Sequence, residues 1–144
     1  MGNVRQISVF VENRTGKLSA ITEVLRESGI NIRALSIADT KDFGILRIVV
    51  NDTDKACDKL LEAACTVTVT EVVAVSIDDE MGSLSGIIGL LNNAGVNIEY
   101  LYSFLAVADG KASIILRVDD NEKAREVLTA GNIALLTEKD ICEM

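Results

Sequence analysis

Two stretches of this chain decide its fold, because they are versions of one sequence. Residues 16–35 read GKLSAITEVLRESGINIRAL, and residues 82–101 read GSLSGIIGLLNNAGVNIEYL. Both begin with Gly-x-Leu-Ser, and both contain a Gly-[Ile/Val]-Asn-Ile step at the same spacing. Self-similarity at a fixed offset is the signature of a repeat architecture. The sequence therefore indicates a tandem duplication.

The repeat continues toward the carboxyl end of each copy. After a slip of two residues in a loop, residues 52–60 match residues 120–128. A chain of 144 residues is long enough for two very small domains. We therefore expect two units, covering residues 1–69 and 70–144.

Each copy predicts the same order of elements, β-α-β-β-α-β. Alternating apolar residues and turn residues place the strands at 7–11, 30–38, 45–50 and 66–70, and at 73–77, 96–107, 112–118 and 134–138. Helical spacing of apolar residues follows Gly16 and Gly82, and Asp52 and Asp120 are expected to cap a second helix in each unit. This order is typical of a ferredoxin-like α+β sandwich. Because no flexible linker separates residues 66 and 77, we expect rigidly juxtaposed units.

Two turns carry a family resemblance. The segments 13–18 (NRTGKL) and 79–84 (DEMGSL), each followed by its Gly-x-Asn-Ile step, resemble the ACT domain family of amino-acid-binding regulatory modules. The residue before the turn glycine, often Pro in that family, is Thr15 or Met81 here. The resemblance implies that the two ferredoxin-like units pair side by side into an extended antiparallel sheet with helices on one face. It also implies that a small amino acid is held at the interface between ACT domains.

The resemblance places a ligand between one unit's turn and the other unit's Asn-Ile step. The candidate ligand-binding residues are Asn13, Arg14, Thr15, Gly16, Leu18, Asn31, Ile32, Asp79, Glu80, Met81, Gly82, Leu84, Asn97 and Ile98. A glycine at a helix N-terminus lets a carboxylate approach free backbone N–H groups. The side chains of Asn13 and Asp79 could accept hydrogen bonds from an ammonium group. Asn31 or Asn97, arriving from across the interface, offers a donor and an acceptor.

Each of these features also has a purely structural interpretation. The glycines can be turn residues, the asparagines can fix the chain after a helix, and the acidic run 78–80 can be a solvated loop. The pair Gly86 and Gly89 favours tight helix packing over binding. The alternating Tyr100, Tyr102 and Phe104 favour a role in a core or an interface.

Composition narrows the class of function. The chain has no histidine, which rules out Ser-His-Asp and Cys-His catalysis, and it contains no phosphate-binding glycine motif. Its net charge of −8 and its 3% aromatic content oppose nucleic-acid binding. Three cysteines without a CxxC pair predict neither a disulfide framework nor a zinc site.

We therefore expect a non-catalytic, cytoplasmic sensor of a free amino acid. It would need no cofactor or metal, and its partners would be the amino acid, a second copy in a homodimer, and a metabolic enzyme. Neither a membrane nor a nucleic acid is expected as a partner. The alternative is a ligand-free structural dimerisation module that regulates a partner enzyme.

Overall fold

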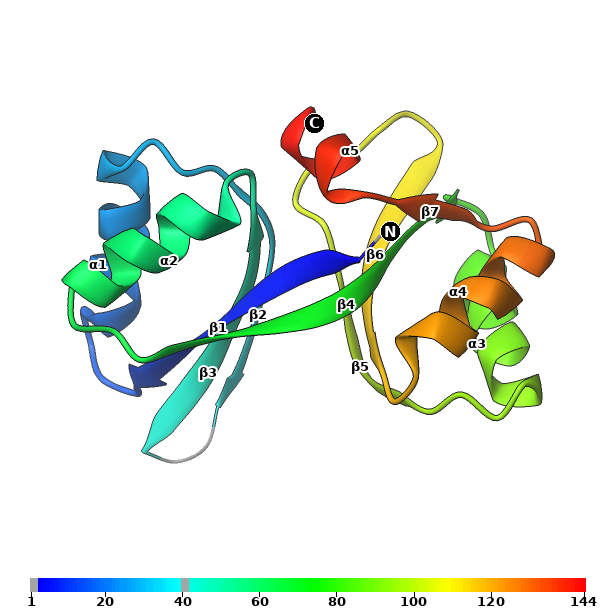
Figure 1. Cartoon of the computed structure of the whole chain (residues 1–144), viewed down its shortest axis with the longest axis horizontal. Helices are drawn as coiled ribbons and strands as arrows, with labels where there is room; N and C mark the ends of the chain where they lie inside the picture. Colours follow the sequence, from blue (N-terminus) through cyan, green and yellow to red (C-terminus); the bar gives the residue numbers. More distant parts are fainter. Residues whose placement is uncertain (1–2, 40–41) are drawn as a thin grey trace.

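The chain folds into two βαββαβ units that share one strand, as a computed structural model describing residues 3–39 and 42–144 shows (Figure 1). The strands are β1 (Val4–Glu12), β2 (Ile32–Asp39), β3 (Phe43–Val50), β4 (Val67–Asp78), β5 (Ile98–Ser103), β6 (Lys111–Val118) and β7 (Ala134–Leu136). The helices are α1 (Lys17–Glu27), α2 (Thr53–Glu62), α3 (Ser83–Asn93), α4 (Asn121–Ala130) and α5 (Glu138–Cys142). The expected α+β class and the repeated element order are confirmed.

The shared strand is β4, which spans 12 residues. Its first half, Val67–Val72, pairs antiparallel with β1 and completes a sheet with β3 and β2, which we call unit 1. Its second half, Val73–Asp78, pairs with β6 on one side and with β7 on the other, and β6 pairs with β5; we call this unit 2. The continuous run expected between residues 66 and 77 is therefore a single strand without a linker.

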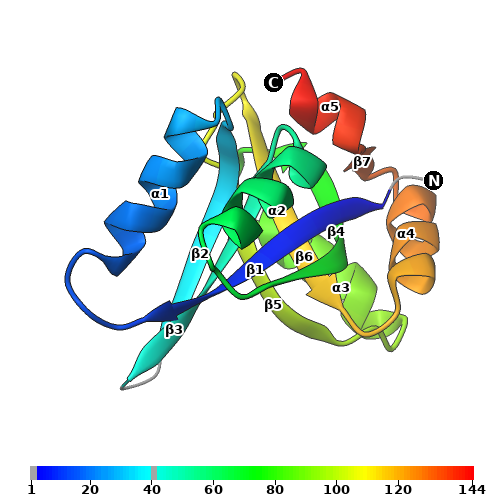
Figure 2. The same cartoon turned by 60° about the vertical axis from the view of Figure 1, so that its left-hand side comes forward.

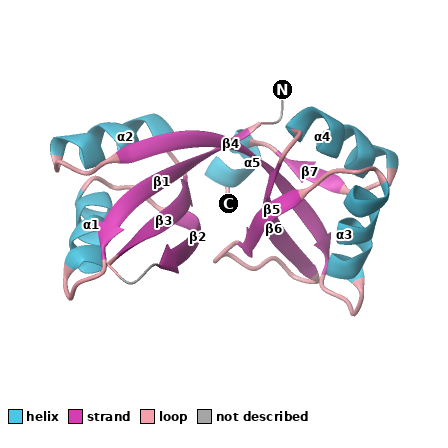
Figure 3. Cartoon of the chain, turned by 90° about the horizontal axis from the view of Figure 1, so that it is seen from below, coloured by secondary structure: helices cyan, strands magenta, loops and turns pink. Residues whose placement is uncertain are grey.

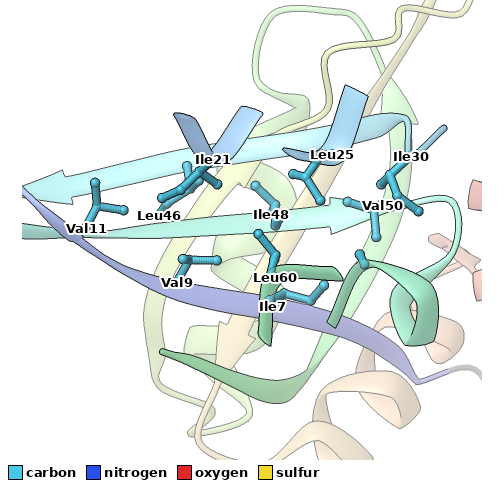
Figure 4. Close-up of a cluster of buried hydrophobic side chains, with 11 residues drawn as sticks. Ile7, Val9, Val11, Ile21, Leu25, Ile30, Leu46, Ile48, Val50 and Leu60 are labelled. Atoms are coloured by element: carbon cyan, nitrogen blue, oxygen red, sulfur yellow. The ribbon is translucent and has the colours of Figure 1, made fainter. Parts of the chain in front are cut away.

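The sheet curls, so that its two halves face each other (Figures 1 and 2). Helices α1 and α2 cover the outer face of unit 1, and α3 and α4 cover the outer face of unit 2 (Figure 3). Each helix pair encloses a core, and Figure 4 shows that of unit 1, where Ile21 and Leu25 of α1 meet Leu46 and Ile48 of β3. A third cluster, the inner core, lies between the two sheet halves. Its buried members are Val4, Ala34, Val49, Val72, Ala74, Tyr102, Phe104, Ile115 and Ile141.

The first helix of each unit begins in the way its glycine predicts. Gly16 and Gly82 have φ of 89° and 87°, a left-handed conformation that residues with a Cβ rarely adopt. The second helices begin at Asp52 and Asp120, whose side chains accept hydrogen bonds from the backbone N–H of the third helical residue. The two units thus use the same pair of helix starts.

Several expectations about local structure were wrong. The last strand was expected over residues 134–138, but β7 ends at Leu136, and Glu138 begins α5. A capping box between Thr137 and Asp140 causes the change, because it satisfies the first amides of a helix. Tight packing was expected at Gly86 and Gly89, but a Cβ at either position would meet nothing within 4 Å.

The expected strand at 96–107 is also shorter than predicted, since β5 covers Ile98–Ser103. The alternating aromatics that follow the Asn-Ile step do have the expected packing role: Tyr102 and Phe104 are buried in the inner core. Within residues 3–39 and 42–144, no helix is long and apolar enough to cross a membrane.

Candidate functional site

The turn between β1 and α1 borders a small pocket in unit 1. This pocket has a volume of about 140 Å³, and its lining residues are Val11, Glu12, Asn13, Arg14, Leu18, Ile37 and Gly44. Three of the expected residues, Asn13, Arg14 and Leu18, are therefore brought together here. Leu18 and Ile37 are large apolar side chains that remain 39% and 47% exposed. The pocket therefore offers an apolar wall beside the start of a helix.

The helix starts at the two turns differ from the others in their capping. No side chain caps α1 at Gly16 or α3 at Gly82, whereas Asp52 and Asp120 cap α2 and α4. The first N–H groups of a helix have no intrahelical partner, and the helix dipole favours an anion there. The Lys17 and Ser83 N–H groups donate to the Arg14 and Glu80 carbonyls at 3.2 Å, so the amides that follow them at these two starts are the ones that can receive a carboxylate.

The second turn has the same backbone but different charges. The Asp79 N–H donates to the carbonyl of Gly110 at 2.9 Å, as the Asn13 N–H donates to the carbonyl of Asp42 at 2.9 Å. Glu80 is exposed and Met81 is fully exposed. The charges beside the turns are paired: Arg14 with Glu12 at 2.9 Å in unit 1, and Lys111 with Asp78 at 2.5 Å in unit 2. All of these ion-pair side chains are more than half exposed.

A wider pocket of about 420 Å³ lies beside the second turn. It is lined by Ser76, Ile77, Asp78, Ser83, Gly86, Ile87, Leu90, Lys111, Asn132, Ile133 and Ala134. None of these was among the expected ligand-binding residues, although Asp78 directly precedes the segment 79–84 and Ser83 lies within it. Ile37 and Gly44, which line the unit 1 pocket, were also missed. Gly44 reaches the turn because β3 pairs with β1, where Gly44 lies opposite Val11, and Ile37 follows through the pairing of β2 with β3. The pairing of β1 with β3 joins residues far apart in sequence, and no local pattern signals it.

The Asn-Ile steps lie at the far ends of their units. The Asn31 N–H donates to Asn51 Oδ1 at 2.9 Å, and the Asn97 N–H donates to Asp119 Oδ1 at 3.0 Å. Both asparagine side chains are exposed. Ile32 and Ile98, the residues that follow, are half-buried and pack against the cores of unit 1 and unit 2.

One chain does not bring a turn and an Asn-Ile step together. Within unit 1, the turn lies at the Phe43 end of β3, where Glu12 pairs with Phe43, and Ile32 pairs with Val50 at the other end. The seven steps from Phe43 to Val50, at about 3.3 Å each, separate them by roughly 23 Å. Between the units, the β1–α1 turn and the α3–β5 loop lie on opposite sides of the molecule (Figures 1 and 3).

A buried polar cluster joins the units where the sheet halves face each other. Gln6 of β1 is fully buried; its Nε2 donates to Tyr100 Oη at 2.8 Å, and its Oε1 accepts from Tyr102 Oη at 2.6 Å. The guanidinium of Arg47 lies 3.9 Å from the centre of the Tyr100 ring. Burial raises the pKa of Tyr102 above the usual tyrosine value, and Tyr100 adds to this effect while Arg47 opposes it. Tyr102 is therefore a neutral donor, and the cluster fixes the inner faces of the two units against each other.

Comparisons with known proteins agree with this architecture. A family model of the ACT domain pair matches residues 2–144, so the chain belongs to the ACT domain family. The crystal structure of protein BT0572 from Bacteroides thetaiotaomicron is similar over 99% of this chain and 98% of that one, with 38% identity and a TM-score of 0.93. The ligand-free regulatory subunit of aspartate kinase from Thermus thermophilus shares the fold over 90% of this chain and 93% of that one, at 15% identity and a TM-score of 0.67.

A curated relative comes from Archaeoglobus fulgidus, where it is described as a probable acetolactate synthase small subunit. It is 30% identical over 81 residues, which are 52% of this chain and 51% of the relative. The match thus spans about half the length of that protein. The family match over residues 2–144 makes the chain an ACT domain pair.

Proposed function

We propose that this protein is a non-catalytic cytoplasmic sensor that binds a small free amino acid at an interface between ACT domains. The observation that carries the proposal is the pairing of an uncapped helix start with an apolar pocket at the β1–α1 turn. The Leu18 and Ser19 amides in the first turn of α1 would hold the ligand carboxylate, and Asn13 would accept from its ammonium group. Leu18 and Ile37 would contact its side chain.

The second half of the site would come from another copy of the chain. Within one chain, each turn lies far from the Asn-Ile step of its own unit and from that of the other unit. A homodimer would supply Asn31 or Asn97 from across an interface, and it would cover the exposed Leu18 and Ile37. In this proposal, residues 1–69 and 70–144 act as the two ACT units, and ligand binding favours one arrangement of the copies over another.

The proposed downstream partner is a metabolic enzyme. The named relatives are a regulatory subunit of aspartate kinase and a probable small subunit of acetolactate synthase. In this proposal the ACT domain pair binds such an enzyme and changes its activity when the amino acid is bound. The two turns differ in charge, with Arg14 in one and Asp79 and Glu80 in the other, so we expect unequal affinities for one ligand.

Thermal unfolding of ligand-free protein against each of the twenty common amino acids at millimolar concentration tests the proposal. A ligand at 100 times its Kd adds about 2.7 kcal/mol. With an unfolding entropy of about 2.1 cal/mol/K per residue, 144 residues give a Tm increase of about 9 °C. Asn13→Ala should reduce the shift if the first turn holds the ligand, and Asp79→Ala should reduce it if the second does.

The control is Asn93→Ala, an exposed change at the end of α3 that should leave the shift unaltered. A Tm that responds to none of the amino acids would favour the ligand-free dimerisation module. A shift that neither turn variant reduces would place the ligand elsewhere on the protein.

A further inference from the structure

Within residues 3–39 and 42–144 the curled sheet has four edges, and three of them are short or partly covered. The outer edges of β2 and β5 face each other, where Ala34 bridges Phe104 and the Leu105 N–H donates to the Arg33 carbonyl at 2.8 Å. The edge strand of unit 2, β7, is only 3 residues long and is followed directly by α5. Short edge strands are one way in which proteins avoid unwanted pairing. The remaining edge is the first half of β4, the outermost strand of unit 1 in Figure 3.

The direction of the backbone groups shows which residues of this edge face outward. The Thr66 carbonyl accepts from Phe10 of β1, and the Asp79 N–H donates to Gly110 on the β6 side. Because the N–H and C=O of successive strand residues point to alternate sides, even-numbered residues of β4 face β1 and odd-numbered residues face the β6 side. Val67 and Val69 therefore present their backbone groups on the β6 side, away from β1.

In the described part of the chain, no strand pairs with that side of Val67 or Val69, because β6 pairs with β4 only from Val73 onward. The Asn121 Nδ2 donates to the Glu71 carbonyl at 3.1 Å and so closes the edge at that end. Thr68 and Val69 are exposed, and Val69 keeps 47% of its surface accessible.

This edge lacks the usual protection against pairing. Residues 63–70 (AACTVTVT) carry no charge in a chain whose net charge is −8, and the strand has a regular register with β1, without a bulge. Natural edge strands that stay unpaired carry a lysine, a proline, a bulge or a covering element. An uncharged edge can also meet an identical edge without like-charge repulsion.

We propose that two copies of the chain pair antiparallel through this edge, centred on Thr68. In that register, Val67 lies opposite the partner's Val69 and Val69 opposite the partner's Val67, so every outward backbone group is paired. Thr68 lies on the two-fold axis beside the partner's Thr68. The contact is isologous, because the same segment serves both copies. This inference goes beyond the proposed ligand site: the β4 edge lies across the unit 1 sheet from Ile37 on β2, so this contact between copies is separate from the interface that would complete the ligand site.

A second copy fits the edge better than an unrelated strand does. The segment is self-complementary in charge and in side-chain shape, with valine meeting valine on one face and threonine meeting threonine on the other. Phe10 and Ile45, which remain 48% and 37% exposed on the adjoining strands, extend the apolar surface beside Thr66 and Thr68. In unit 2, Ser76 takes the position of Phe10 and Ser113 takes the position of Ile45. The sheet edge of unit 2 is the short strand β7.

Light scattering coupled to size-exclusion chromatography tests the contact directly. The wild type should elute at twice the 15.5 kDa mass of one chain, and Thr68→Lys should elute at a single mass. This substitution sets like charges opposite each other on the axis, yet it leaves pairing with β1 intact because the Thr68 side chain is exposed. Ala134→Lys, at the exposed start of β7, is the matched control and should keep the wild-type mass.

Amide hydrogen exchange gives a second readout that does not depend on a variant. The amides of Val67 and Val69 should exchange more slowly at high protein concentration than at low concentration. A wild type of single mass with concentration-independent exchange would overturn both the contact and the homodimer. A Thr68→Lys variant that keeps the double mass would overturn the contact alone. Amino-acid binding is tested separately by the Tm screen.

Discussion

Replacing Tyr102 with phenylalanine removes the hydroxyl that donates to Gln6 Oε1 at 2.6 Å across the two units. Gln6 is fully buried, so its amide oxygen would lose a partner in a place that water reaches poorly. Leaving a buried polar group unsatisfied costs about 1–3 kcal/mol. With about 2.1 cal/mol/K of unfolding entropy per residue, 144 residues convert 2 kcal/mol into a Tm decrease of about 7 °C.

Differential scanning calorimetry of Tyr102→Phe, Gln6→Leu and the double variant measures this effect. Replacing both partners with apolar groups of similar shape costs less than removing either one alone. We therefore expect the double variant to be more stable than the sum of the single effects by about 1 kcal/mol or more. Thr22→Ala, which removes an exposed hydrogen bond of 3.0 Å, should change the stability by less than about 0.5 kcal/mol. Additive effects, or a Tm for Tyr102→Phe within about 1 °C of wild type, would refute the reasoning.

Further predictions concern helix starts and ends. Gly95 has a φ of +74°, so Gly95→Ala should lower the free energy of unfolding by about 1 kcal/mol. Gly86→Ala places a methyl group in open space within a helix and should raise the free energy of unfolding by up to about 1 kcal/mol. Equal responses of the two variants in thermal unfolding would contradict this. Asp120→Ala should cost about 1 kcal/mol in urea unfolding by removing an N-cap, and Asp120→Asn should recover most of it. Hydrogen bonds from the Thr137 backbone and hydroxyl lower the pKa of Asp140, so its contribution to α5 is present at neutral pH and is lost as the pH falls through the lowered pKa. An NMR titration of Asp140 with a midpoint at or above the usual aspartate value would contradict the last prediction.

The repeated sequence was enough to predict the units, because each element has a local signal that occurs twice. Gly16 and Gly82 mark helices that begin after a residue in the left-handed conformation, and Asp52 and Asp120 mark helices capped by a side chain, so these residues predict the order of elements. The missed helix α5 also had a local signal. Thr137, followed three residues later by an acidic residue, is a form of the capping box, but the repeat pattern favoured continuation of the strand.

The curl of the sheet and the relative positions of the two halves of the ligand site could not be predicted in this way. Both depend on contacts between residues far apart in sequence, such as Gln6 with Tyr102 and Ala34 with Phe104. Gln6 occupies the position that Val72 takes in the second copy, and nothing local shows that this polar residue has a buried partner. Residue types at the turns were therefore predictable, whereas their distance from Asn31 and Asn97 was not.

Because β4 belongs to both units, its side chains alternate between the two faces of the sheet in one unbroken pattern. Val67 points into the core of unit 1, and Val73 and Val75 point into the core of unit 2, all from odd-numbered positions of one uninterrupted strand. A shift of one residue in a strand moves every side chain to the opposite face. The length of the chain at the junction is therefore restricted: two residues could be inserted between the halves, but a single insertion would turn one unit's core outward unless a bulge absorbed it.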